Sequence, residues 1–292
     1  LPIFRLMKND EMITLAKFLA ISGIILPMLP HKNLIPDINL TPYSIWLATV
    51  VVSGISYLSY LLKRYVFHES GTLVSGIIGG LYSSTATISV LARKSRKASE
   101  QEATDYVAAM LLAVSMMFLR FMILILIFSR EIFLSIYPYL LTMAVVAAIV
   151  AWFIHSRQKR PEGQSAETEE DDSSNPLEFK VALIFAILFV IFTFLTHYTL
   201  VYAGTGGLNL LSFVSGFSDI TPFILNLLQN TGSVAALIIT ACSMQAIISN
   251  IMVNMFYALF FAGKGSKLRP WILGGFGVVI VCNLVLLLFF YI

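Results

Sequence analysis

Charged residues are scarce in this chain: they make up 12% of its 292 residues, while 58% are hydrophobic. Soluble domains have about a quarter of their residues charged, so a soluble globular protein is excluded. The apolar residues form blocks of about 20, the length of helix that crosses a bilayer, whereas strands of a membrane barrel alternate over about ten. We therefore expect an all-α integral membrane protein. Seven blocks are predicted to span: 12–29, 44–62, 104–129, 132–154, 179–202, 233–262 and 271–291.

Catalytic and metal-binding motifs are missing as well. The sequence has no Gly-rich phosphate loop, His-Glu metal motif, nucleophile elbow or pair of catalytic carboxylates. Its two cysteines, Cys242 and Cys282, lie in apolar blocks without metal-ligand spacing. A lipid-modifying enzyme would need a cluster of His, Asp or Ser at one membrane interface, and none is visible. We expect neither enzymatic activity nor a cofactor, and the sequence leaves a metal site undecided.

One polar segment, residues 155–178, interrupts the apolar pattern. It begins with basic residues and then becomes strongly acidic, with Gly and Ser between the charges. Such a composition is typical of a solvated linker. It divides the chain into a first membrane repeat with an extra N-terminal helix, 1–154, and a second membrane repeat, 179–292.

The two parts resemble each other in sequence. A shift of 136 residues places Gly80 on Gly216, Thr85 on Thr221 and Ile88 on Ile224. These pairs lie in two matched blocks, 70–92 and 205–229, whose centres are rich in Gly, Ser, Thr and Pro. Each block either spans or forms a re-entrant helical hairpin, whose polar turn lies at membrane depth and is enclosed by protein.

The distribution of Lys and Arg distinguishes these alternatives. If all nine blocks span, eight basic residues face nine on the opposite side, and with one hairpin the ratio is twelve to five. With two hairpins, fifteen share one side, Lys32 and Arg130 lie on the other, and Lys17 and Arg120 are intramembrane. The positive-inside rule favours two hairpins. The N-terminus and the linker are then cytoplasmic, the C-terminus is outside, and the halves are inverted repeats whose hairpin tips meet near the midplane.

The two tips carry the polar residues that are candidates for binding. Thr221 followed by Pro222 predicts the N-cap of a half-helix, and Ser84 or Thr85 is its counterpart in the first tip. Two helix N-termini that converge in a low dielectric attract an anion or a carboxylate. Glycines allow a tight turn and close approach of a ligand, or they only allow close helix packing. The residues expected to shape the turns are Gly79, Gly80, Gly216 and Pro222.

Isolated charged and amide side chains inside the apolar blocks are further candidates. Asp219 is the one carboxylate deep in an apolar stretch, and it is expected to be a proton carrier, a cation ligand or the partner of a base, or else only a helix cap. Arg120 either pairs with Asp219 or extends to the outer interface. Asn250 and Asn254 share a helix face, where they either bond neighbouring helices or line a polar path.

Several segments resemble a known family. These are LPMLP, WLATVVVSGISYLSYLL, GGLYSSTATISVLARKS, SGFSDITPF and ISNIMVN. They are similar to the C-terminal membrane domain of unknown function of MgtC/SapB-type bacterial proteins. The resemblance implies a bacterial inner membrane protein. The link of MgtC relatives to magnesium homeostasis belongs to another domain of those proteins.

Together these patterns predict a membrane transporter or channel for a small ion or polar solute that binds between the hairpin tips. The alternative is a non-transporting regulatory membrane protein, linked to magnesium homeostasis, that binds another membrane complex. Expected partners are the lipid bilayer, the solute and, in a homo-oligomer, further copies of the chain; nucleic acid is not expected. The predicted binding residues are Ser83, Ser84, Thr85, Thr87, Arg120, Ser218, Asp219, Thr221, Asn250 and Asn254.

Overall fold

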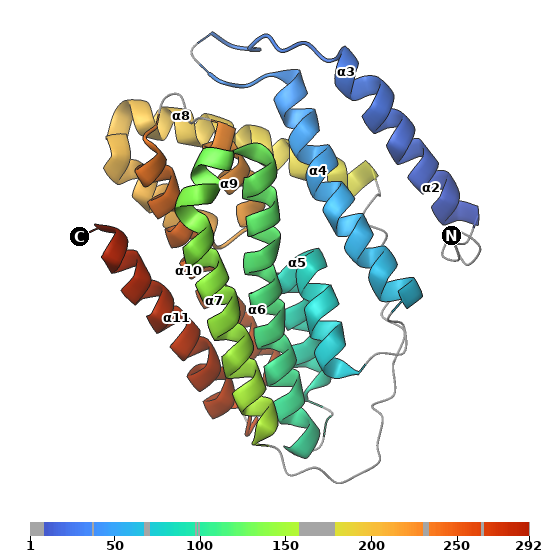
Figure 1. The fold of residues 1–292 in the computed structure, drawn as a ribbon, viewed down its shortest axis with the longest axis vertical. Helices are drawn as coiled ribbons and strands as arrows, with labels where there is room; N and C mark the ends of the chain where they lie inside the picture. Colours follow the sequence, from blue (N-terminus) through green and yellow to red (C-terminus); the bar gives the residue numbers. More distant parts are fainter. Residues whose placement is uncertain are drawn as a thin grey trace.

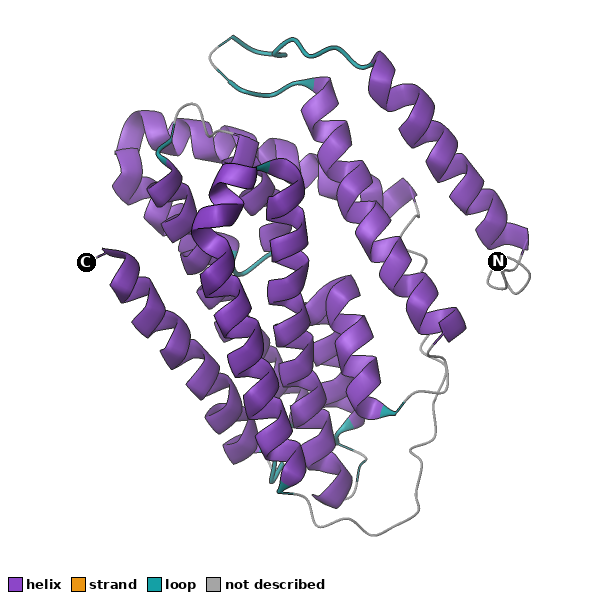
Figure 2. Cartoon of the chain, viewed as in Figure 1, coloured by secondary structure: helices purple, strands orange, loops and turns teal. Residues whose placement is uncertain are grey.

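The described part of the chain is helical. The computed structural model describes residues 9–36, 38–66, 71–96, 98, 100–157, 179–229, 234–263 and 266–291. Within these ranges the structure has no strand, and one isolated bridge joins Ile35 to Ile38 (Figure 2). The helices before the polar segment are α2 (Asn9–Ala20), η1 (Ile21–Ile25), α3 (Leu26–Met28), α4 (Pro42–Leu61), η2 (Leu62–Val66), α5 (Thr72–Lys94), α6 (Glu100–Phe128) and α7 (Arg130–Ser156). Those after it are α8 (Phe179–Ser215), α9 (Ile220–Gln229), α10 (Ala236–Ala262) and α11 (Arg269–Tyr291).

Seven of these helices are long and apolar enough to cross a membrane, which confirms the expected class of protein. Their ranges are 42–65, 72–94, 103–128, 130–156, 182–215, 236–262 and 269–289. One member differs from the predicted set: 72–94 is included, whereas the predicted span 12–29 contributes only the shorter apolar stretch 18–28. Lys17 is the one charged residue within 12–29, and the apolar stretch begins directly after it.

Local sequence signals explain where the helices begin. Thr41 and Ser44 form a reciprocal capping box at the start of α4, followed directly by Pro42. Ser129 is the only residue between α6 and α7, and its hydroxyl accepts a hydrogen bond from the Ile132 N–H. Because this connection is so short, α6 and α7 form an antiparallel pair (Figure 1).

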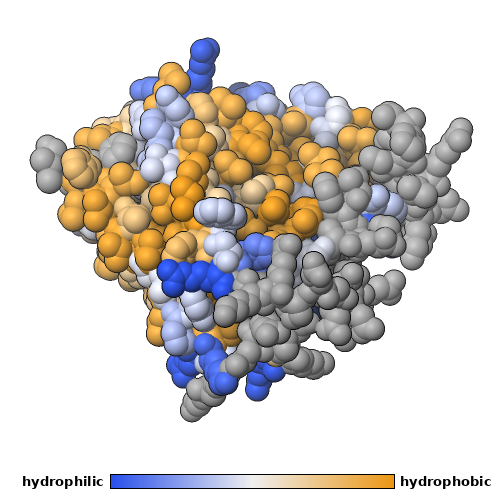
Figure 3. All heavy atoms as spheres, turned by 60° about the horizontal axis from the view of Figure 1, so that its bottom comes forward, coloured by the Kyte–Doolittle hydropathy of each residue, from blue (hydrophilic) through white to orange (hydrophobic). Residues whose placement is uncertain are grey.

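The core lies along α6 and α10. Of the seven candidate spans, the α10 segment is the most enclosed: 67% of its most apolar 18-residue stretch is buried. Phe118 of α6, Phe189 of α8 and Phe223 of α9 are fully buried in the same cluster. Apolar side chains also cover much of the outer surface that Figure 3 shows, as expected of helices that face lipid. The fold therefore has an apolar exterior, and its most enclosed segments lie on α6 and α10.

The helix α5 is broken at Ser83 and folds back on itself. The backbone there is extended (φ −159°, ψ 107°) between two helical stretches. A Cβ atom on Gly79 would lie 2.5 Å from the Thr87 hydroxyl oxygen, although these residues are eight apart. In a straight helix they would be separated by about 12 Å along the axis. The two halves of α5 therefore lie side by side.

The first half of α5 packs against α6 and runs in the same direction. Gly76 lies against the Ala109 backbone and Gly80 against that of Ala113, with 2.3 and 2.5 Å from the position of a Cβ atom to the nearest atom. Small residues four apart permit this close approach of two helices in a membrane. Because the second half of α5 leads within a few residues into the start of α6, both ends of α5 lie at that end of α6.

The segment that ends α8 and forms α9 repeats this arrangement beside α10. The helix α8 breaks at Gly204, whose φ of +60° is a conformation that L side chains rarely adopt. Beyond the break, Asn209 contacts Cys242 and Gly216 contacts Asn250, so this part of α8 runs parallel to α10. The helix α9 then returns along α8: Asn226 donates to the Thr193 hydroxyl at 2.6 Å.

The helices α6 and α10 run in opposite directions. Arg96, which precedes α6, lies beside Gly263 at the end of α10, and the Arg93 guanidinium lies 5.0 Å from the centre of the Phe261 ring. The end of α10 is thus at the beginning of α6. The two helix pairs that follow the broken segments are therefore antiparallel to each other, as Figure 1 also shows.

Candidate functional site

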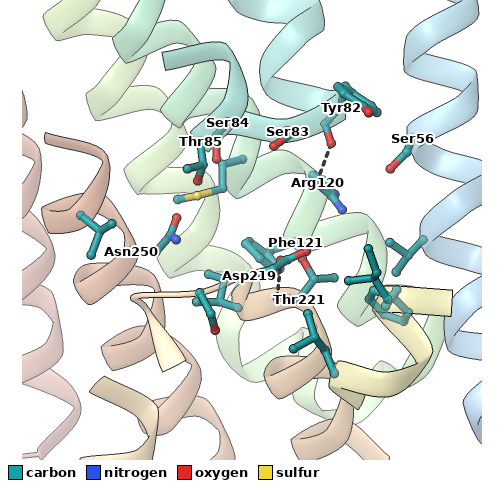
Figure 4. Close-up of a pocket in the computed structure, with 18 of the residues that line it drawn as sticks. Ser56, Tyr82, Ser83, Ser84, Thr85, Arg120, Phe121, Asp219, Thr221 and Asn250 are labelled. Atoms are coloured by element: carbon teal, nitrogen blue, oxygen red, sulfur yellow. Dashed lines mark hydrogen bonds between the residues drawn. The ribbon is translucent and has the colours of Figure 1, made fainter. Parts of the chain in front are cut away.

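A cavity of about 430 Å³ lies between the two broken segments. Its walls come from α4, α5, α6, α8, α9 and α10 (Figure 4). Its polar lining residues are Ser53, Ser56, Tyr82, Ser83, Ser84, Thr85, Arg120, Ser218, Asp219, Thr221, Asn250 and Tyr257. Its apolar lining residues are Val52, Met117, Phe121, Ile184, Phe185, Leu188, Phe217, Ile220 and Val253. A volume of this size is in the range of small-molecule sites.

The first tip faces the cavity through the break in α5. Ser83 is the extended residue before the second half-helix, and its hydroxyl accepts a hydrogen bond from the Ala86 N–H at 3.3 Å. Ser83 is therefore the N-cap, so the prediction of Ser84 or Thr85 is wrong by one or two residues. The side chains of Ser84 and Thr85 line the same wall (Figure 4), so this tip presents hydroxyls and the positive end of a helix to the cavity.

The second tip is capped by a carboxylate. The Asp219 Oδ1 atom accepts a hydrogen bond from the Thr221 N–H at 2.9 Å, and α9 begins at Ile220. The predicted N-cap, Thr221, is therefore wrong by two residues: it lies at the second helical position and Pro222 at the third. Asp is as good a cap as Thr, and a Pro in the first turn removes no intrahelical hydrogen bond. The α9 N-terminus also opens onto the cavity.

Arg120 brings a positive charge between the two tips. It extends from the second half of α6, and its Nη1 donates to the Tyr82 carbonyl oxygen at 2.9 Å (Figure 4). Its Nε is buried and has no hydrogen-bond partner. The guanidinium therefore faces inward, which removes the expectation that it extends to the outer interface. An inward Arg with unused donors can bind a negatively charged group.

Asp219 and Arg120 line the same cavity without forming an ion pair. Asp219 bonds its own helix start, and Arg120 bonds the opposite tip. Their charges influence each other through the cavity, but neither neutralises the other by contact. The expected Asp219–Arg120 pair is not formed in this structure.

The remaining predicted residues have different surroundings. Asn250 lines the cavity and donates to the Gly216 carbonyl oxygen at 3.2 Å. Asn254 is fully buried one turn further along, where its amide donates to Asn250 Oδ1 at 3.1 Å, and it does not line the cavity. Thr87 packs under Gly79 instead of facing the cavity. Eight of the ten predicted residues thus surround one cavity, and their roles there stay predictions.

Sequence reasoning missed the contribution of α4. Ser53 and Ser56 line the cavity from this helix, and Ser59 continues the same spacing of three residues. A row of hydroxyls on one face of an otherwise apolar helix was the signal that could have identified them. Tyr82 and Tyr257 were also missed, because aromatic residues are common in apolar blocks and carry no distinctive spacing.

Metal coordination finds no support in the geometry. Among the described residues, no group of three or more His, Cys, Asp and Glu side chains is close enough to hold a metal ion. The cavity itself has one carboxylate, whereas divalent cations prefer several oxygen ligands, including one or two carboxylates. The chemistry of the lining is that of one guanidinium, one carboxylate, several hydroxyls and an amide.

Comparison with known proteins places the cavity inside a recognised domain. The family model described as "Domain of unknown function (DUF4010)" matches residues 50–262, which include every residue that lines the cavity. A protein of Aquifex aeolicus (strain VF5), described as uncharacterized, is 25% identical over 227 residues, which are 76% of this chain and 96% of that protein. No solved structure matches the chain. These matches confirm the resemblance to a membrane domain of unknown function, whereas its MgtC/SapB-type setting stays a prediction.

Proposed function

This chain belongs to the DUF4010 family, and we propose that it carries a small ion or polar solute across a membrane, with the solute bound between the two tips. The observation that supports this most is the cavity itself: two interrupted helices direct their N-termini into it, and an Arg from a third helix lies between them. Secondary transporters bind their substrates in such places, at discontinuous helices near the middle of the membrane. Backbone that is not helical is tolerated at that depth only where it lines a cavity or is buried in protein.

The proposal treats both broken segments as re-entrant hairpins. The contact of Gly79 with Thr87 and the parallel packing of Gly76 and Gly80 on α6 support this for α5. The contacts of Asn209 and Gly216 with α10 support it for the second segment. In this arrangement each segment enters and leaves on one side, and the membrane is crossed by the other long helices.

The element order supports an inverted repeat. The starts of α6 and α10, Glu100 and Ala236, are 136 residues apart, as are the caps Ser83 and Asp219. The contacts follow the same shift, because Gly80 lies on Ala113 and Gly216 on Ser249. Two equivalent units in opposite orientations give the site two similar routes, one to each side, which is the basis of alternating access.

The proposed location is a bacterial inner membrane. The excess of Lys and Arg on one side of the double-hairpin topology supports a cytoplasmic linker and an outside C-terminus and, with 12–29 as a further span, a cytoplasmic N-terminus. The match in Aquifex aeolicus is a bacterial protein. The solute and the lipid bilayer are the partners that this function requires.

Purified protein in liposomes tests transport directly. Stopped-flow swelling in potassium chloride, potassium propionate, sodium chloride and glycerol should show that the protein makes the membrane permeable to at least one of these solutes. Thr85→Val and Asp219→Asn should reduce that flux at least about fivefold, because the first removes a hydroxyl and the second a negative charge from the cavity wall. Thr142→Val, an exposed position on α7, is the matched control and should leave it unchanged.

Two outcomes would contradict the proposal. Flux that Thr85→Val and Asp219→Asn leave unchanged would show that solute does not pass the tips. The absence of flux for every solute would favour the alternative, a regulatory membrane protein that binds another membrane complex, in which the tips serve only for assembly.

A further inference from the structure

We propose that the solute is a small organic anion with a single carboxylate, and that Arg120 is the residue that binds it. This inference rests on the proposed function for its site, but it concerns the charge and chemistry of the ligand, which the transport proposal leaves open. Three features of the cavity carry it: the sum of its charges, the different hydrogen bonding of its two charged side chains, and the presence of both polar and apolar side chains in its lining.

The charges of the described cavity residues do not cancel. Arg120 and Asp219 are the only charged side chains in the lining, and they contribute one charge of each sign. The N-termini of the second half of α5 and of α9 add about half a positive charge each. The sum is about one positive charge. A singly charged anion brings it close to zero, whereas a monovalent cation raises it to about two in a region of low dielectric.

The two charged side chains are also not equally free to bind a ligand. The Asp219 carboxylate already serves as the cap of α9 through the Thr221 N–H. Arg120 makes one hydrogen bond, to the Tyr82 carbonyl oxygen, and its buried Nε has no partner. The Arg120 guanidinium lines the cavity, so a carboxylate bound there can accept charge-assisted N–H bonds from it.

The walls of the cavity favour an organic anion over an inorganic one. The tips and Arg120 contribute polar groups to the lining, with hydroxyls at Ser83, Ser84 and Thr85. Phe121, Phe185 and Leu188 add apolar surface to the same lining. A halide or a hydrated oxyanion would gain nothing from these apolar side chains, whereas the hydrocarbon part of a short carboxylate would be removed from water against them.

Calorimetric titration of the purified chain in detergent tests the inference without relying on transport. Potassium propionate is the probe, and potassium chloride at the same ionic strength is the reference. Propionate should bind and chloride should not. Arg120→Lys should weaken binding by about tenfold, because it keeps the charge and loses the planar fork, and Arg120→Gln should weaken it by about a hundredfold.

Matched variants separate binding from folding. Arg130→Gln removes an exposed Arg outside the cavity and should bind propionate as the wild type does. Asp219→Asn keeps a capping side chain and removes the negative charge, so it should bind propionate several-fold more tightly. If Arg120→Gln does not fold, Arg120→Lys and Asp219→Asn still test the inference, because they predict changes of opposite sign.

The outcomes for the ligand and for transport can be told apart. Propionate binding that Arg120→Lys does not weaken would overturn the inference, and so would tighter binding of alanine, whose ammonium group would use Asp219. Flux of a cation that is independent of Arg120 would overturn the inference and leave the proposed transport intact. Arg120-dependent propionate binding with no flux of any solute would support the ligand class and contradict transport.

Discussion

In both tips a break in the backbone is followed by a half-helix, but the residues that cap the two half-helices differ in charge. In the first, the half-helix is capped by the neutral hydroxyl of Ser83; in the second, by the carboxylate of Asp219. The caps are 136 residues apart, the same shift that relates Gly80 to Gly216. A cap needs only a hydrogen-bond acceptor, so this position can be neutral or charged without a change of fold. The cap is thus where the halves can diverge in electrostatics while their geometry is kept.

The glycines below the tips differ in what they approach. Gly80 lies against backbone atoms of Ala113, whereas Gly216 lies mainly against the Ser249 side chain, whose Cβ and Oγ are 2.3 Å from where a Cβ atom would be. Ser249 in turn donates to the Phe213 carbonyl oxygen at 2.6 Å. The first contact is fixed by the backbone, and the second includes a side chain that can be changed. This difference can be tested by mutation.

Membrane topology offers the largest expected effect, because labelling is nearly all or none. In a chain with Cys242→Ala and Cys282→Ala, single cysteines are placed at Thr72 and Arg96, at the two ends of α5, and at Thr205 and Ala235, around the second segment. An impermeant maleimide added outside intact cells should label the Thr205→Cys and Ala235→Cys proteins only. This follows if each segment enters and leaves on one side and the two halves are inverted.

Marker positions make this experiment interpretable. Arg130→Cys should be labelled from outside and Arg157→Cys only after the cells are opened. Labelling of Thr72→Cys and Arg96→Cys from opposite sides would mean that α5 spans the membrane. That result would show that the two broken segments are not equivalent hairpins, whichever solute is bound.

The glycine contacts give the next largest effect. Gly80→Ala and Gly216→Ala should each lower the free energy of unfolding by about 1–3 kcal/mol, because the added Cβ atom overlaps neighbouring atoms. Gly277→Ala in α11, where nothing lies within 4 Å, should be neutral or slightly stabilising. The measurement is thermal unfolding in detergent, with size-exclusion chromatography as the readout.

Second mutations should then separate the two halves. The cost of Gly216→Ala should be smaller in a Ser249→Gly background, because the overlapping side-chain atoms are gone. The cost of Gly80→Ala should be the same in an Ala113→Gly background, because the overlapping atoms belong to the backbone. If both second mutations changed the cost of the glycine substitution equally, the Gly216 contact would not differ from the Gly80 contact in depending on a side chain.

The sequence predicts the outline of the fold better than its details. Long apolar blocks and two interrupted blocks at matched positions were visible, since Gly, Ser, Thr and Pro gather at Gly80 and Gly216. The exact caps were not, because several good capping residues are adjacent in each tip and tertiary contacts select among them. The predicted span 12–29 was found only as the shorter apolar stretch 18–28.

The cavity was predictable only in part for a similar reason. Sequence position brings Thr85 and Thr221 to the tips, but the rotation of each half-helix decides which side chains face inward. Thr87 faces Gly79 because the fold-back places them together, and no local pattern contains that contact. The bond from Arg120 to the Tyr82 carbonyl joins residues 38 apart and likewise depends on how α5 packs on α6.

The caps themselves give the smallest expected effect and the most direct comparison of the tips. Asp219→Ala should lower the free energy of unfolding by about 1 kcal/mol, because the Thr221 N–H loses its acceptor. Ser83→Ala should cost less, since its hydrogen bond to the Ala86 N–H is longer, at 3.3 Å. Asp219→Ser gives the second tip the same type of cap as the first. Its free energy of unfolding should be within a few tenths of a kcal/mol of that of the wild type. The same thermal unfolding assay applies. If Asp219→Ser were as costly as Asp219→Ala, the carboxylate would be needed for stability beyond capping, and the charge at this tip could not be a feature that the two halves are free to vary.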